Sequence, residues 1–157
     1  MILPHRGTRT ATVRLALKSW EESKMLLDGV NHIAWISKDV DRLGRFYTTV
    51  FDAVVGPTRE HGPGETMTVI DIGPATQLNI FVIDGNTEAD RQTPMWRRGR
   101  IDHVGLAAAS QEAFETIRSR LVDAGASDGT VNDFGKALSI FFRDPDGLEG
   151  EVLLPKP

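Results

Sequence analysis

Two histidines and a glutamate occupy positions from which they could share a metal ion. His32 lies in the apolar stretch VNHIAWI, His103 lies in IDHVGL, and Glu151 lies in LEGEVLLP near the end of the chain. A single histidine in a strand is most often held by hydrogen bonds, but it can also be partly exposed or act as a ligand or acid–base group. Two imidazoles and a carboxylate that converge from separate strands form the 2-His-1-carboxylate set, which binds iron and other divalent ions.

Both histidines belong to an internal repeat. The segment that starts at Val30, VNHIAWISKDVDRLGRFYTTVFDAVVG, aligns without a gap with IDHVGLAAASQEAFETIRSRLVDAGAS, which starts at Ile101. The alignment places His32 on His103 at a spacing of 71 residues. A period of this length that occurs twice predicts two copies of one supersecondary unit.

Each copy predicts a βαβββ unit, and the whole chain therefore an α+β fold. Short apolar runs that are typical of strands open the two copies, at 30–36 and 101–107. Apolar residues then recur at helical spacing over 40–51 and 114–121. Three further strands are predicted in each copy, near 54–60, 65–72 and 76–83 and near 127–133, 137–143 and 148–154.

The repeat also relates residues on the last strand of each copy. Side chains alternate between the two faces of a strand, so a match of apolar residues fixes which polar residues are equivalent. Matching TQLNIFV with LEGEVLLP puts Asn79 at the position of Glu151. His32, Asn79, His103 and Glu151 are then four symmetry-related positions.

Composition excludes several classes of function. The chain of 157 residues carries 18 lysines and arginines against 22 aspartates and glutamates, and it has no cysteine. The basic residues are scattered, so no nucleic-acid partner is expected. The lack of cysteine excludes disulfides and thiolate metal sites, and we expect a cytoplasmic protein. No apolar run approaches the roughly 20 residues that span a bilayer, so we expect no membrane association.

The repeat divides one domain, at 28–155, into module one at 28–84, a linker at 85–99 and module two at 100–155. Residues 1–27 form an N-terminal extension. Three interpretations of this extension stay open: an ordered extra helix or strand, a flexible basic tail, and translation that starts at Met25.

Several motifs resemble the vicinal oxygen chelate superfamily: the starts NHIAW and DHVGL, the helix FYTTVFDA and the closing stretch FFRDPDGLEGEV. That superfamily includes glyoxalase, methylmalonyl-CoA epimerase, extradiol dioxygenases and the bleomycin and fosfomycin resistance proteins. The resemblance covers about residues 28–155. It implies that the two βαβββ modules form a curved, cup-shaped mixed sheet with flanking helices, in which an ion binds adjacent oxygens of a small substrate.

The resemblance also assigns roles to single residues. The family's ligand positions on first and last strands carry His32, His103 and Glu151, and the implied cofactor is one divalent ion of zinc, nickel, cobalt, manganese or iron. Asn79 departs from the pattern, because that position usually carries Glu, Gln or His. It would bind the ion through its carbonyl or give way to a water. Glu151 would also be catalytic, as a proton carrier that leaves and rejoins the ion.

Substrate contacts are predicted from residues near these ligands. Gln77 and Phe81 share the face of Asn79, and Phe141 is a candidate on a neighbouring strand. Gln77 and Phe81 could equally pack against neighbouring side chains. His61, in the glycine-rich stretch REHGPGET, is expected to be exposed.

The leading hypothesis is a metal-dependent glyoxalase-like enzyme, an isomerase, epimerase or lyase that acts on a small substrate with vicinal oxygens. One alternative is an Fe(II) extradiol-type dioxygenase, which the resemblance leaves open because those enzymes use two histidines and one glutamate. Another is a non-catalytic small-molecule binding or antibiotic-resistance-type protein. The expected partners are the small-molecule substrate and a second copy of the chain in a homodimer, as in many relatives.

Overall fold

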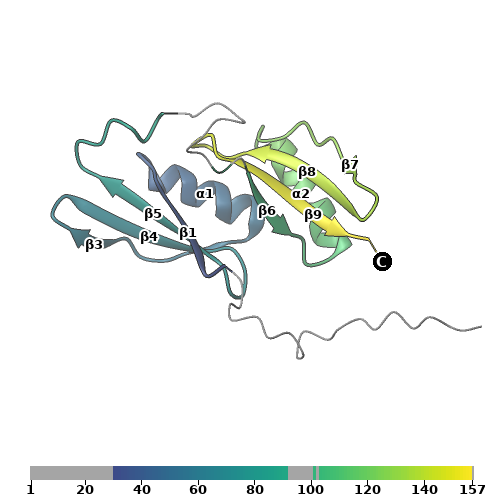
Figure 1. The fold of residues 1–157 in the computed structure, drawn as a ribbon, viewed down its shortest axis with the longest axis horizontal. Coiled ribbons are helices and arrows are strands. Elements are labelled where there is room, and N and C mark those ends of the chain that lie inside the picture. Colours follow the sequence, from purple (N-terminus) through teal and green to yellow (C-terminus); the bar gives the residue numbers. More distant parts are fainter. Residues whose placement is uncertain (1–29, 92–100, 102, 157) are drawn as a thin grey trace, which may run out of the picture.

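The computed structural model describes residues 30–91, 101 and 103–156, and it confirms the predicted α+β fold (Figure 1). The predicted N-terminal extension and residues 92–99 of the predicted linker lie outside the described residues. The described chain forms two mixed sheets, one from each copy of the repeat.

Module one builds a sheet with the strand order β1-β5-β4-β2, and β3 pairs with β4 beside β2. The first and last strands of the module run parallel, and the other pairs are antiparallel. The elements are β1 (His32–Ile36), α1 (Val40–Phe51), β2 (Val54–Val55), β3 (Arg59–Gly62), β4 (Glu65–Asp71) and β5 (Gln77–Ile83).

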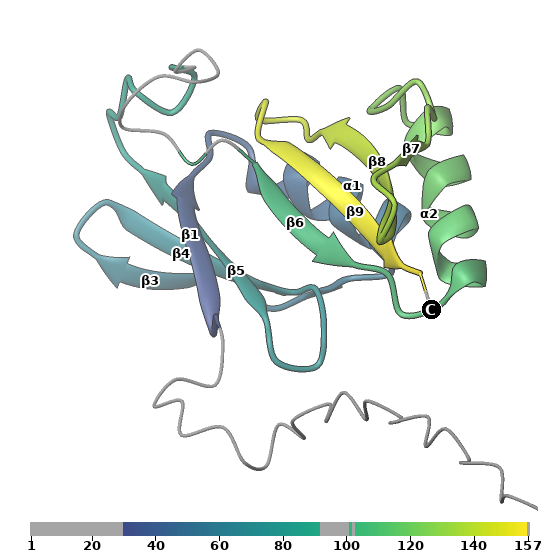
Figure 2. The same ribbon diagram turned by 45° about the vertical axis from the view of Figure 1, so that its right-hand side comes forward.

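Module two repeats this plan with the strand order β6-β9-β8-β7, again with its first and last strands parallel. Its elements are β6 (Val104–Ala107), α2 (Gln111–Asp123), β7 (Asn132–Asp133), β8 (Ala137–Arg143) and β9 (Glu149–Pro155). Figures 1 and 2 show the two sheets next to one another, with α2 against the second sheet.

Two predicted strands differ from the structure. The strand predicted at 54–60 is split into β2 and β3, and Pro57, which lies between them, has no N–H for a sheet hydrogen bond. The strand predicted at 127–133 is reduced to β7. The reason is local: Ser127 Oγ accepts the Gly129 N–H and Asp128 Oδ1 accepts the Thr130 N–H, so these side chains form turns where the strand was expected.

Both helices begin after a polar N-cap residue. Asp39 Oδ1 accepts the Arg42 N–H at 2.9 Å, and Ser110 Oγ accepts the Ala113 N–H at 3.1 Å. Gly125, with a φ of 66°, follows α2 and lets the chain turn away in the left-handed region. The caps fix where each helix starts against its sheet.

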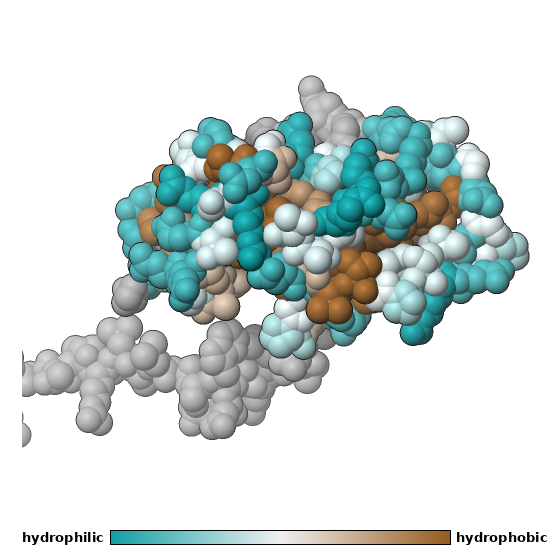
Figure 3. All heavy atoms as spheres, turned by 180° about the vertical axis from the view of Figure 1, so that it is seen from behind, coloured by the Kyte–Doolittle hydropathy of each residue, from teal (hydrophilic) through white to brown (hydrophobic). Residues whose placement is uncertain are grey.

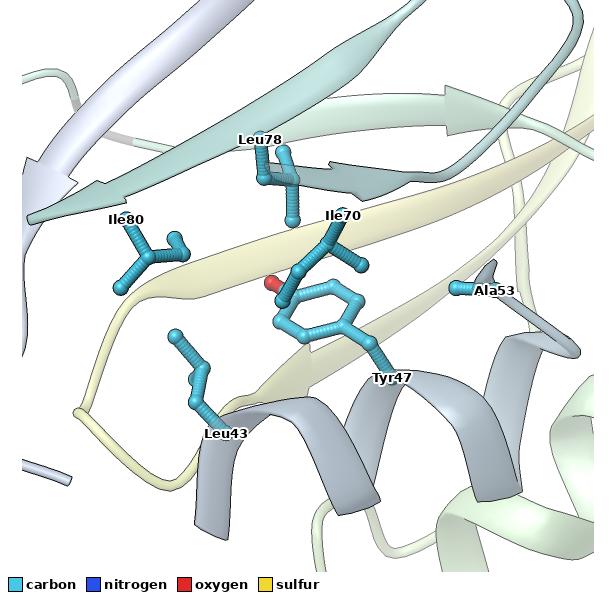
Figure 4. Packing of buried hydrophobic residues seen from close by; sticks show 6 residues of the cluster. All are labelled: Leu43, Tyr47, Ala53, Ile70, Leu78 and Ile80. Atoms are coloured by element: carbon cyan, nitrogen blue, oxygen red, sulfur yellow. The ribbon is translucent and has the colours of Figure 1, made fainter. Parts of the chain in front are cut away.

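The hydrophobic core has two parts, and α1 contributes to both. Figure 4 shows Tyr47 of α1 surrounded by apolar residues of the first sheet. One turn further on, the fully buried Val50 packs with Phe114 of α2 and with Phe142 of β8. Because one helix is buried against both sheets, the two modules share a core and are fixed relative to each other.

Polar contacts also join the modules. Arg42 Nη2 of α1 lies 2.6 Å from Asp146 Oδ1, and the Tyr47 hydroxyl donates to Asp144 Oδ2 at 3.3 Å. Both aspartates belong to the turn between β8 and β9. At the other end of α1, Arg120 of α2 forms an ion pair with Asp52 at 2.8 Å.

A cavity of about 410 Å³ lies between the modules. Its lining includes Phe51 at the end of α1, Ile72 of the β4–β5 connection and Ala113 of α2. The molecular surface is mixed, with hydrophobic residues scattered among hydrophilic ones on the face shown in Figure 3. Among the helices of the described chain, none has the length and apolar character needed to cross a membrane.

Candidate metal centre

The register of the two parallel strand pairs confirms the predicted equivalence of Asn79 and Glu151. Glu151 lies opposite Gly105, and Asn79 lies opposite Ala34. A Cβ added at Gly105 would lie 3.2 Å from Leu153 Cδ1 and 3.8 Å from Glu151 Oε2, so a larger side chain there would crowd both residues.

The structure brings His103 and Glu151 together. His103 Nε2 lies 3.3 Å from Glu151 Oε2, across the first and last strands of module two. The His103 side chain is 36% exposed, whereas the Glu151 side chain is 9% exposed. An imidazole at the edge of solvent and a nearly buried carboxylate therefore face one another, as two ligands of one ion would.

A hydrogen bond from β8 also holds the Glu151 carboxylate in place. The Ser139 hydroxyl of β8 donates to Glu151 Oε1 at 2.5 Å, and Ser139 itself is fully buried. This length is typical of a hydroxyl that donates to an ionised carboxylate. Sequence analysis missed Ser139, because a serine inside the apolar run ALSIFF carries no pattern that points to a site.

These contacts fit a divalent ion. A buried carboxylate is costly unless it meets a cation or several donors, and Glu151 has a hydroxyl on one oxygen and an imidazole beside the other. Imidazole nitrogen with carboxylate oxygen is a donor set that zinc, iron and manganese accept. His103 and Glu151 could therefore hold a metal ion.

His32 does not join them. It is exposed, and its Nδ1 lies 2.9 Å from Oδ1 of the adjacent Asn31. Within the part of the chain that the structure describes, no three His, Cys, Asp or Glu side chains form a cluster that could hold a metal. The structure thus assembles two of the predicted ligands and leaves the role of His32 a prediction.

Asn79 carries an unusual oxygen. Its Oδ1 is buried and has no hydrogen-bond partner among the described residues. A buried carbonyl oxygen without a donor costs about 1–3 kcal/mol, so such an atom often marks the place of a ligand or ion. Asn79 lies opposite the small residue Ala34 of β1.

Phe141, predicted to contact substrate, lies next to His103. The two rings meet edge to face, with centroids 5.7 Å apart and an interplanar angle of 80°. Phe141 is 43% exposed although it is a large aromatic residue. It pairs directly with Glu151 across β8 and β9, so it forms one wall of the His103–Glu151 site.

The other two predicted substrate contacts lie in module one. Gln77 Nε2 donates to Asp71 Oδ1 at 2.9 Å, so this side chain is already engaged. Phe81 packs against the His61 ring, with centroids 5.0 Å apart and an angle of 75°. His61 is exposed as expected, but a register shift between Glu60 and Gly62 lets it reach Phe81. No local sequence pattern predicts this bulge.

A second acidic residue flanks the site. Glu149 is buried, shares the face of Glu151 and forms an ion pair with Arg143, its direct partner on β8. The arginine compensates the charge of Glu149, whereas Glu151 has a neutral donor in Ser139. The two neighbouring carboxylates are thus held by different chemistry.

The Asp144 turn lies apart from these ligands and has its own electrostatics. Burial raises the pKa of the Asp144 carboxyl to about 6, although backbone N–H groups of Leu148 and Asp146 act in the opposite direction. Burial and the nearby Asp144 raise the pKa of the Tyr47 hydroxyl well above its ordinary value. This pair joins the two modules.

Comparison with known proteins places the chain in a family. The Glyoxalase/Bleomycin resistance protein/Dioxygenase superfamily matches residues 29–152. A search of the curated proteins finds no match.

Solved structures share the fold at low identity. A glyoxylase/bleomycin resistance protein/dioxygenase domain from Frankia sp. EAN1pec has a TM-score of 0.69 and 22% identity, over 83% of this chain and 93% of that chain. A mutant of the fosfomycin resistance protein FosX from Listeria monocytogenes, complexed with Mn(II) and 1S,2S-dihydroxypropylphosphonic acid, has a TM-score of 0.59 and 18% identity, over 81% and 92%. The oxidase ChaP-H2 has a TM-score of 0.56 and 23% identity, over 85% and 96%.

Proposed function

Because this chain belongs to the glyoxalase/bleomycin resistance protein/dioxygenase superfamily, we propose that it is a metal-dependent, glyoxalase-like enzyme. Its reaction would be an isomerisation, epimerisation or lyase reaction on a small substrate with vicinal oxygens. The observation that carries this proposal is the convergence of His103 Nε2 and Glu151 Oε2 to 3.3 Å at a nearly buried carboxylate.

His103 and Glu151 would hold one divalent ion, and His32 and Asn79 are the proposed further ligands. A divalent ion with an open coordination position supplies Lewis acidity, which stabilises negative charge that develops on substrate oxygens. The unpartnered Oδ1 of Asn79 supports its inclusion, since a cation would satisfy that oxygen.

The protein's own groups would do the remaining work. We assign both roles of Glu151, ligand and proton carrier, to Oε2, because Oε1 already accepts the Ser139 hydroxyl. The exposed ring of Phe141 would position the substrate beside His103. Glu149 is paired with Arg143 and is therefore less suited to accept a proton.

Metal content tests the proposal directly. We would purify the untagged full chain anaerobically and measure bound metals by mass spectrometry in the wild type and in the Glu151→Ala and His103→Ala variants. We expect about one equivalent in the wild type and a loss in both variants. As a matched control, His61→Ala removes an exposed imidazole that packs on Phe81 and should keep the ion.

The result also decides between reaction classes. Bound zinc, nickel, cobalt or manganese would direct assays to isomerase, epimerase and lyase substrates. Bound iron, with oxygen uptake on catechols that is lost in air and restored by ferrous iron, would instead establish an extradiol-type dioxygenase. A full equivalent of metal in His103→Ala would show that the assigned ligand is wrong.

A non-catalytic binding protein is the second candidate. It is favoured by one observation: the structure does not bring His32 to the His103–Glu151 pair, while the exposed Phe141 ring could hold a ligand without an ion. A wild-type protein that binds no divalent ion, even in excess, would support this function over the enzyme.

We further propose a homodimer. Val54 and Phe134 are large hydrophobic residues with exposures of 64% and 59%. Exposed apolar side chains favour association with a second copy. Light scattering after size-exclusion chromatography should give twice the 17.3 kDa mass of one chain.

A further inference from the structure

Ser139 is fully buried, and its hydroxyl donates to Glu151 of the proposed metal centre. We infer that Ser139 is a positioning residue, whose hydroxyl holds one oxygen of Glu151 so that the other oxygen alone is presented to the ion. This inference rests on the proposed function, because it assigns a role to Ser139 only if Glu151 is a ligand.

Sheet geometry puts Ser139 within reach of Glu151. Phe141 lies directly opposite Glu151, and Ser139 precedes Phe141 by two residues on β8. Ser139 therefore points to the same face of the sheet and is a diagonal neighbour of Glu151. The fully buried hydroxyl reaches Oε1 at 2.5 Å.

The two oxygens of Glu151 consequently differ. Oε1 accepts a short hydrogen bond from a hydroxyl that solvent cannot reach, whereas Oε2 faces His103 at 3.3 Å. A carboxylate held in this way cannot rotate freely to offer both oxygens. We conclude that Glu151 would bind through Oε2 alone and would keep this orientation in the absence of the ion.

Module one supplies an internal comparison. There Asn79 replaces Glu151, and Met67 lies opposite Phe81 as Ser139 lies opposite Leu153. The buried hydroxyl is therefore present in the module that has the carboxylate and is replaced by a thioether in the module that lacks it. This difference supports a role of the Ser139 hydroxyl toward the Glu151 carboxylate.

A buried hydroxyl elsewhere provides a matched control. The Thr68 side chain, in a residue 2% exposed on β4, shares a 2.7 Å hydrogen bond with the Thr58 hydroxyl. Thr68→Val and Ser139→Ala each remove one buried hydroxyl from a central strand. In Thr68→Val the lost partner is the Thr58 hydroxyl, whereas in Ser139→Ala it is the Glu151 carboxylate.

The experiment measures Mn(II) affinity of the full chain by titration calorimetry and by the paramagnetic resonance signal of free Mn(II). We expect Ser139→Ala to weaken binding about 10- to 100-fold, which is typical when a group that orients a metal ligand is lost. Ser139→Thr, which keeps a hydroxyl donor, should restore most of the affinity, and Thr68→Val should leave it unchanged. The visible spectrum of bound Co(II) should change in Ser139→Ala and remain as in the wild type in Thr68→Val.

Each outcome decides a different question. Wild-type affinity and an unchanged Co(II) spectrum in Ser139→Ala would overturn the inference while the proposed metal centre stands. Equal losses in Ser139→Ala and Thr68→Val would also overturn it, since the effect would then come from general destabilisation. A wild-type protein that binds neither Mn(II) nor Co(II) would overturn both the inference and the proposed function.

Discussion

The two modules share one backbone plan but carry different chemistry on equivalent positions. In module two, Glu151 lies opposite Gly105 and meets an imidazole. In module one, Asn79 lies opposite Ala34 and its carbonyl oxygen has no partner among the described residues. Equal register thus does not give equal side-chain chemistry. The repeated backbone places equivalent residues on the same face, and the residue types then determine which contacts each module makes.

The same contrast appears in the core. Ile70 lies opposite Leu78 in module one, whereas the equivalent pair in module two is Phe142 opposite Gly150. A Cβ added at Gly150 would lie 2.2 Å from the Phe142 ring. Two residues of medium size in one module are therefore replaced by a large and a minimal one in the other, because the space between the strands and the helix is limited.

The turns that precede the last strands differ as well. The turn in module two carries Asp144 and Asp146, which contact Tyr47 and Arg42 of α1. The connection in module one has the sequence IGPAT and carries no acidic residue. Its first residue, Ile72, lines the cavity beside α2. One turn therefore ties the modules together, and the equivalent connection borders an open space.

The largest expected effect comes from giving module two the chemistry of module one. Glu151→Asn removes the buried carboxylate, and we expect it to weaken Mn(II) binding by more than about 100-fold, since a direct ligand contributes more than a group that orients one. Calorimetric titration would measure the loss. The exchanged variant Asn79→Glu/Glu151→Asn should not recover binding, because the carboxylate would lose both the His103 contact at 3.3 Å and the hydrogen bond from Ser139. Recovery would show that the modules are interchangeable.

The next effect tests the core comparison. Gly150→Ala should lower the free energy of unfolding by about 1–3 kcal/mol, because the added methyl overlaps the Phe142 ring. Denaturant unfolding would measure this. Phe142→Leu in the same chain should recover part of the loss by making space. If Gly150→Ala is as stable as the wild type, the Phe142 ring has moved with little loss of unfolding free energy. The packing at Gly150 would then not require a glycine.

The fold could be predicted from the sequence because periodic patterns of residues encode it. The gapless repeat, the short apolar runs of the strands and the helical spacing of apolar residues are visible in the sequence itself. They were sufficient to match Asn79 with Glu151, a relation that the strand register confirms. Sequence also identified His103 and Glu151 as candidate ligands, and the structure brings these two together.

Other features of the site depend on contacts that no local pattern records. Ser139 lies in an apolar run, and its role is visible only when β8 pairs with β9. His61 reaches Phe81 because of a bulge in strand pairing. His32 is equivalent to His103 in the alignment, yet its imidazole contacts a sequence neighbour. Strands determine faces, whereas side-chain orientation depends on which partners the other strands supply.

A smaller effect on stability is expected from Asp144, in the turn between β8 and β9. Folding raises the pKa of Asp144 from 3.8 to about 6. Between these pH values the folded state therefore binds more protons than the unfolded chain. The free energy of unfolding should then fall as the pH rises through this window, and the Asp144 contribution is about 1 kcal/mol between pH 5 and pH 7. Asp144→Asn should remove this part of the pH dependence in denaturant titrations. Parallel curves for the two proteins would contradict the assignment.

The smallest effect concerns the ion pair that connects the same turn to α1. Arg42→Ala should cost about 0.5–1 kcal/mol of unfolding free energy, because the arginine is half exposed while Asp146 is 10% exposed. Arg91→Ala is the control. Its partner Glu88 lies three residues earlier in the chain, and both side chains are well exposed. The loss of unfolding free energy in this variant should be close to zero. High salt should reduce the Arg42 effect, since screening weakens a pair that solvent reaches. Equal costs for the two variants would show that the Asp144–Gly147 turn stabilises the modules through Tyr47 and its own backbone hydrogen bonds, and not through charge.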